Sequence, residues 1–128
     1  MNTLIREYLI AIARSPKGSC TYSEVNNRGT LGLDFSLERD RARIGQILGE
    51  VAEYEFRHGR PLLSAVVLHS DDTGQGDGFF KICEALGLGS ARQLKRDEFG
   101  VIEMGNCHRF WRDELNFARF GVLGEPHS

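Results

Sequence analysis

The sequence comprises 128 residues, of which 41% are apolar and 27% are charged. These values are typical of one globular domain, which can fold without a metal or disulfide. The 16 Lys and Arg residues stand against 18 Asp and Glu residues. This balance excludes the overall positive charge of many proteins that bind nucleic acids or anionic membranes, so such binding requires a local basic patch.

The cysteines and the N-terminal stretch indicate a reducing compartment. Cys20, Cys83 and Cys107 have no C-x-x-C spacing, so we expect buried free thiols rather than disulfides or a zinc knuckle. The first 15 residues are amphipathic and charged, unlike a signal peptide. No apolar run approaches the roughly 20 residues of a membrane span. We therefore expect a cytoplasmic protein that does not contact membranes.

The first half of the chain predicts two helices. Apolar residues recur at helical spacing over residues 3–14, and a Pro- and Gly-containing stretch at 15–19 ends that helix. Residues 20–25 favour a short extended or turn-like piece, and the loop after it has room for one short helix. Ser36 is a suitable N-cap for a long central helix, which ends at His58 and Gly59.

A strand and a loop are predicted next. The apolar, β-branched run over residues 62–69 has the length and composition of a buried strand. Residues 70–78 contain three glycines and three aspartates, which predict a solvated turn or loop.

The remainder of the chain predicts helices. Apolar residues from Phe79 to Leu86 have helical spacing, and Gly87 occupies the place of a C-terminal helix glycine. Residues 88–105 have a weak pattern, with four expected core anchors: Leu94, Phe99, Val101 and Ile102. Asn106 is a predicted cap for a C-terminal helix with a broad apolar face.

These elements together predict an α+β fold in a single domain, residues 1–128. Residues 1–87 would form a winged-helix-like part with a short, mainly antiparallel sheet. Residues 88–128 would form a C-terminal helical extension.

Three groups of residues carry family resemblances. Residues 21–25 (TYSEV), followed by the long helix and the strand, resemble the winged-helix unit of many bacterial regulators and of alkyltransferase-like DNA proteins. The Pro-Cys-His-Arg signature of the alkyltransferases is absent from the sequence, so the resemblance implies no alkyl transfer. The stretches GRPLLSA (59–65), GDGFF (76–80) and FWRDEL (110–115) are also similar to a family of small bacterial proteins, and that similarity implies no activity.

A local basic patch is predicted on the central helix. Arg39 and Arg43 share a face near its start, and Arg57 and Arg60 follow at its end. These four arginines are the candidate nucleic-acid-binding residues, because guanidinium groups on a helix face reach phosphate oxygens. The alternative is that this part of the helix is an ordinary solvent-exposed surface that carries both positive and negative charges. The same helix contains five acidic residues: Glu38, Asp40, Glu50, Glu53 and Glu55.

The glycine-rich loop offers an alternative based on catalysis. His69 precedes Asp71 and Asp72, and with His108 these residues are candidates for acid–base chemistry in a small hydrolase. No G-x-S-x-G elbow is present. The loop also lacks the spacing of phosphate-binding motifs and of EF-hands, so we predict no cofactor and no metal.

The leading hypothesis is a non-enzymatic bacterial binding module for a macromolecular partner, either a protein or double-stranded DNA. Regulators, immunity proteins and defence or counter-defence factors are often small chains of this kind. A protein partner would contact the acidic loop and the aromatic C-terminal helix, with these candidate residues: Asp71, Asp72, Asp77, Phe110, Trp111 and Phe117. The breadth of that helix's apolar face also allows a homodimer.

Overall fold

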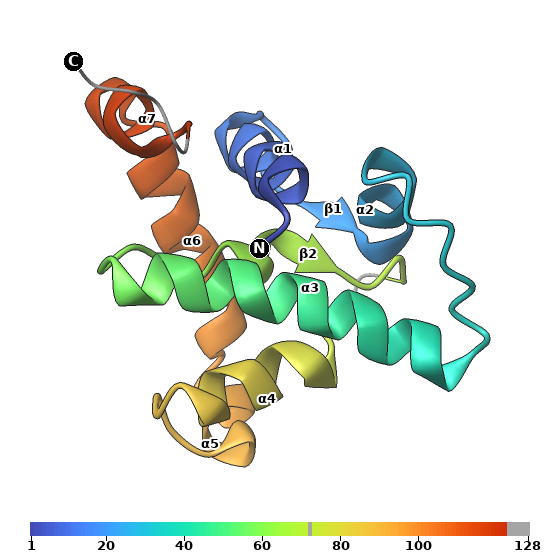
Figure 1. Ribbon diagram of the computed structural model, residues 1–128. Helices are drawn as coiled ribbons and strands as arrows, with labels where there is room; N and C mark the ends of the chain where they lie inside the picture. The colour runs from blue at the N-terminus through green and yellow to red at the C-terminus, as the bar shows by residue number, and fades with distance from the viewer. Residues whose placement is uncertain (72, 123–128) are drawn as a thin grey trace.

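The computed structural model describes residues 1–71 and 73–122 of the protein. These residues form seven α-helices, one 3-10 helix and two short strands (Figure 1). In chain order they are α1 (Thr3–Arg14), β1 (Cys20–Thr21), α2 (Tyr22–Arg28), α3 (Glu38–Arg57), η1 (Leu63–Val66), β2 (Val67–Leu68), α4 (Asp77–Ala85), α5 (Ala91–Arg96), α6 (Phe99–Trp111) and α7 (Glu114–Phe120). None of the described helices combines the length and apolar character needed to cross a bilayer.

The predicted winged-helix-like fold is wrong. Within the described ranges the single sheet has two strands, β1 and β2, which pair in parallel with Cys20 opposite Val67. Parallel strands cannot be joined by a tight hairpin, and here the connection contains α2 and α3. After β2 the chain passes through a loop into α4 and does not return as an antiparallel strand. The molecule is therefore mainly helical.

The strand predicted over residues 62–69 is confirmed only at Val67 and Leu68. The four preceding residues form η1, and all of them are buried. η1 packs against α1, α3 and α6. It is therefore enclosed on several sides, and its residues do not alternate between buried and exposed. A short buried apolar run has the same pattern in either conformation.

Three of the predicted helices are confirmed, and two of the predicted N-caps are misplaced. α1, α3 and α4 occupy the expected segments. The N-cap of α3 is Leu37 rather than Ser36. α6 begins at Phe99, so Asn106 lies within a helix; Asp113 caps the last helix, α7, by accepting hydrogen bonds from two backbone N–H groups. Residues 123–128 of the predicted extension lie outside the described residues.

The helices pack around η1 and the strand pair. In Figure 1, α3 crosses the front of the molecule, α6 runs behind it, and α4 and α5 lie below. One buried apolar cluster draws side chains from both parts of the predicted domain, including Leu9, Val51, Phe79 and Trp111. The segments before and after residue 87 thus share a core.

A buried ionic cluster lies between α1, α3 and α7. Glu55 has no solvent-exposed surface, and its carboxylate accepts from Arg6 Nε and from Arg60 Nε, each at 2.6 Å. The Arg6 guanidinium also donates to the backbone carbonyl of Phe120 at 2.8 Å. The cluster therefore joins the first helix, the end of the central helix and the end of the last helix.

We predict that Glu55→Gln lowers the free energy of unfolding by about 3–5 kcal/mol, because it leaves two buried guanidinium groups without a carboxylate. Urea denaturation followed by circular dichroism measures this change. Glu53→Gln is the matched control, since Glu53 pairs with Arg57 at the surface and its loss should change stability by less than about 1 kcal/mol. Similar losses in the two variants would contradict the role assigned to the cluster.

Candidate functional site

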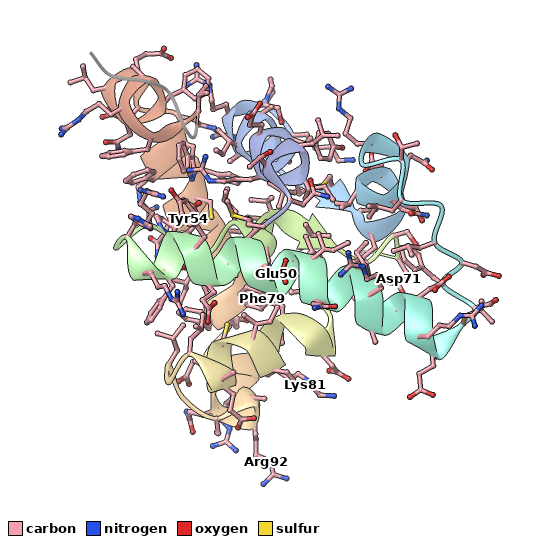
Figure 2. All side chains as sticks on the ribbon, viewed as in Figure 1. Glu50, Tyr54, Asp71, Phe79, Lys81 and Arg92 are labelled. Atoms are coloured by element: carbon pink, nitrogen blue, oxygen red, sulfur yellow. The ribbon has the colours of Figure 1, made fainter. Side chains whose placement is uncertain are left out.

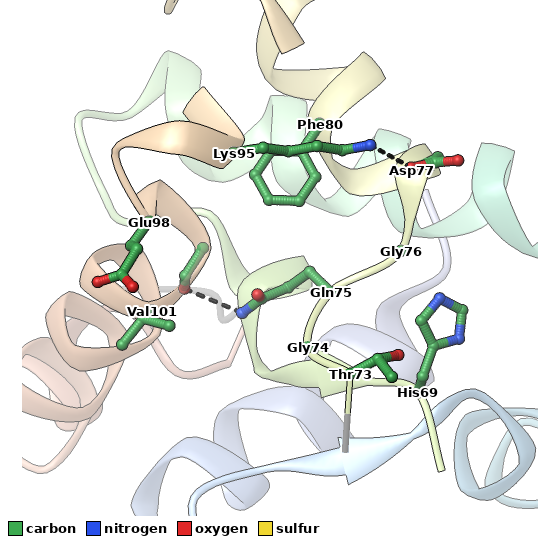
Figure 3. A pocket seen from close by; sticks show the side chains of 11 residues that line it. His69, Thr73, Gly74, Gln75, Gly76, Asp77, Phe80, Lys95, Glu98 and Val101 are labelled. Carbon is green, nitrogen blue, oxygen red and sulfur yellow. Dashed lines mark hydrogen bonds and ion pairs between the residues drawn. The ribbon is translucent and has the colours of Figure 1, made fainter. Parts of the chain in front are cut away.

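The loop between β2 and α4 is held by its neighbours. His69 N–H donates to the Gly74 carbonyl at 3.0 Å, which closes the loop. The Gln75 side-chain amide donates to the carbonyls of Ala65 (2.7 Å) and Gly100 (2.9 Å); Figure 3 shows the contact with Gly100. Gln75 thus ties the loop to η1 and to the start of α6.

Two clefts open on either side of this loop. The first has a volume of about 470 Å³ and includes His69, Lys95, Glu98 and Val101 in its lining (Figure 3); we call it the loop cleft. The second has a volume of about 340 Å³ and lies against α2, α3 and the start of α4; we call it the tyrosine cleft, after Tyr22. His69, Gly76 and Asp77 line both clefts.

The carboxylates near the loop have partners of their own. Asp77 forms an ion pair with Lys95, and the hydrogen bond and positive charge of Lys95 lower the pKa of Asp77. Asp71 accepts hydrogen bonds from the hydroxyl (2.7 Å) and the backbone N–H (3.2 Å) of Thr73, which lower the pKa of Asp71. Both groups are therefore ionised at neutral pH.

Among the described residues, His108 lies apart from the other members of the predicted acid–base group. His108 Nε2 lies 2.8 Å from the Gly18 carbonyl, and His108 lines neither of the two clefts. Asp71 is bonded to Thr73 rather than to His69, and Asp72 lies outside the described residues. His69 alone faces the clefts, with its ring 5.3 Å from that of Tyr22 (centroid distance).

The cysteines do not supply a nucleophile. All three are buried and free. Burial raises the pKa of Cys20 and of Cys83 to about 12 and raises the pKa of Cys107 well above its ordinary value. A thiol that stays protonated at neutral pH is a poor nucleophile. Over residues 1–71 and 73–122, no three His, Cys, Asp or Glu side chains are grouped so as to hold a metal ion.

The four predicted nucleic-acid-binding arginines do not lie on one surface. Arg39, Arg43 and Arg57 are exposed, whereas Arg60 is only 8% exposed and belongs to the ionic cluster. Arg57 pairs with Glu53 at 3.5 Å.

Other charged side chains do not extend this patch. Glu50 is exposed on the same helix, between Arg43 and Arg57 in the chain. Lys81 and Arg92 project from α4 and α5, away from α3 (Figure 2). The basic side chains are thus dispersed and interleaved with acidic ones.

The predicted aromatic partner-binding residues mostly face the interior. Trp111 has no exposed surface, and Phe110 packs edge-on against it with ring centroids 4.9 Å apart. Phe117 is 36% exposed, and the guanidinium carbon of Arg14 lies over its ring, 3.9 Å from the ring centroid. Of the acidic candidates, Asp77 borders the clefts.

Sequence reasoning missed most residues that line the clefts, including Tyr22, Phe35, Arg41, Lys95 and Glu98. They come from five separate segments, and no local pattern connects them. Val101 and Ile102 were expected to be core anchors, but they are 61% and 53% exposed. The one signal in the sequence for this region was that Val101 and Ile102 are adjacent apolar residues in a segment of weak helical periodicity.

Comparisons of this chain with protein-family models, with curated proteins and with solved structures found no match.

We predict that the native protein resists alkylation by iodoacetamide at about pH 8, because its thiols are buried and protonated. Mass spectrometry should find no modified cysteine in the native protein and three in urea. Rapid native modification of any of the three would contradict the burial described above.

We predict that Gln75→Ala lowers stability by about 1–3 kcal/mol, because it removes two side-chain hydrogen bonds to backbone carbonyls. Hydrogen exchange measured by NMR should become faster at the His69 amide. Gln93→Ala is the matched control, since the side chain of Gln93 bonds only the exposed Asp97 among the described residues. Unchanged exchange at His69 would show that Gln75 does not hold the loop.

Proposed function

We propose that the protein is a non-enzymatic, cytoplasmic binding module and that its partner is a protein that docks at the loop cleft. The supporting observation is an exposed apolar pair, of which Val101 lines this cleft and Ile102 follows it in the chain. Val101 and Ile102, in the first turn of α6, are 61% and 53% exposed. Aliphatic side chains that are exposed next to each other and beside a cleft are typical of contact surfaces.

The surroundings of this pair suit a protein partner. Glu98 supplies a negative charge beside Val101, and the ion pair of Lys95 with Asp77 lies across the cleft (Figure 3). An apolar centre with a rim of mixed charges is the usual anatomy of a protein–protein contact. Double-stranded DNA, in contrast, favours a continuous basic surface. The arginines of α3 do not provide one, because acidic residues separate them, and Arg60, which follows the helix, is buried.

The hydrolase alternative receives less support from the geometry. His69 has no hydrogen bond to a carboxylate among the described residues, and His108 bonds the Gly18 carbonyl instead. Regulators, immunity proteins and defence or counter-defence factors all act through macromolecular contacts, and the identity of the partner will decide among these roles.

A photo-crosslinking amino acid tests the proposed surface in cells. We predict that p-benzoylphenylalanine at Val101 or Ile102 yields a discrete crosslinked product, because both side chains would be covered by the partner. The matched control is the same amino acid at Leu115, which is 74% exposed on α7 and lines neither cleft. Equal products at Leu115, or none at Val101 and Ile102, would contradict the proposal.

Fluorescence anisotropy of labelled mixed-sequence duplex DNA distinguishes the other partner class. We expect no binding that weakens steeply as salt rises. If such binding is present and is lost in Arg39→Gln/Arg43→Gln, the partner is DNA and the proposal of a protein partner is wrong.

A further inference from the structure

The tyrosine cleft has the form of a small-molecule site. Tyr22 and Phe35 supply aromatic side chains, and Arg41 lines the same cleft. Its volume of about 340 Å³ lies within the range of ligand pockets. It differs from the loop cleft in having two aromatic residues and an arginine in its lining.

Two glycines widen this cleft. Gly45 lies in the interior of α3, and Gly78 lies in the first turn of α4. Apart from its chain neighbours and its own helix backbone, a Cβ atom added to either glycine would meet no atom within 4 Å, so close packing does not require glycine there. Glycine within a helix is about 1 kcal/mol less favourable than alanine. At Gly45 the chain thus gives up helix stability and keeps space open.

A small recess extends the cleft toward the core. It has a volume of about 20 Å³, and its lining includes Tyr22, Gly45 and Gly78, which also line the tyrosine cleft. Ser64 lines the recess as well, and it is only 3% exposed. Among the described residues, Ser64 Oγ has no hydrogen-bond partner. The recess holds one water-sized group, so a polar atom of a ligand there would satisfy this buried hydroxyl.

The polar groups along the rest of the cleft favour an anion. The Arg41 guanidinium donates to the Phe35 carbonyl at 2.7 Å and forms no ion pair with a described carboxylate. Asp77, the acidic residue in the lining, is paired with Lys95.

We propose that the tyrosine cleft binds a small molecule with a planar aromatic ring, an anionic group at one end and a hydroxyl or amino group at the other. The ring packs against Tyr22 and Phe35, the anionic group contacts Arg41, and the hydroxyl or amino group reaches Ser64 in the recess. The tyrosine cleft shares His69, Gly76 and Asp77 with the loop cleft, but the residues proposed to hold the small molecule differ from Val101 and Ile102, so either proposal can fail without the other.

The probe is 4-hydroxybenzoate, followed by ¹H–¹⁵N NMR titration of the full chain. We expect saturable shifts at the amides of Gly45 and Gly78 and none at Gly59, which lines neither cleft. The neutral analogue 4-hydroxybenzamide should bind about tenfold more weakly, because it lacks the charge that Arg41 contacts. Absence of saturable shifts at Gly45 and Gly78 at millimolar probe would overturn the proposal.

Three variants locate the probe. Gly45→Leu should abolish binding by filling the cleft while retaining the fold, which its melting curve checks. Arg41→Gln should weaken binding about tenfold, whereas Arg39→Gln, a change at a neighbouring exposed arginine outside the cleft lining, should leave it unchanged. Ser64→Ala should remove the preference for 4-hydroxybenzoate over benzoate. Full affinity in folded Gly45→Leu, or equal effects of the two arginine variants, would overturn the site.

Discussion

The Glu55 carboxylate is enclosed by the guanidinium groups of Arg6 and Arg60, and the arrangement of the helices depends on this contact. Arg6 comes from α1 and also bonds the last turn of α7, while Glu55 lies in the last turn of α3. A buried carboxylate is tolerated only when charged partners and hydrogen bonds replace water. The helices that supply those partners are therefore fixed relative to one another, and with them η1, β2 and the loop that separates the two clefts.

The sequence predicted the helices whose apolar residues recur over several turns, as in α1 and α3. It failed where the decisive contacts are distant in the chain. The apolar run before His69 is equally compatible with a strand and with η1, and only its enclosure by three helices distinguishes them. The pairing of Cys20 with Val67 joins segments that the sequence gives no reason to align in parallel.

The candidate site was predictable only in outline. The glycine-rich loop, which was a candidate in the sequence, contributes to the lining of two clefts, and His69 borders both. Arg60, in contrast, was expected to be a surface residue at a charged helix end, yet it is buried. Arg60 is buried because it binds a carboxylate five residues earlier that also binds Arg6. No local sequence pattern predicts this shared contact. Tyr22, Arg41 and Ser64 converge only because the helices pack as they do.

The bond from Arg6 to the Phe120 carbonyl spans 114 positions of the chain, and this separation has a consequence for biosynthesis. While the protein is being translated, Arg6 and Glu55 leave the ribosome long before α7. The ionic cluster therefore stays incomplete, with its charges hydrated, until nearly the whole described chain has emerged. Because a contact of such long range is closed late, the helices reach their final packing only after α7 has emerged from the ribosome, and until then they are partly docked.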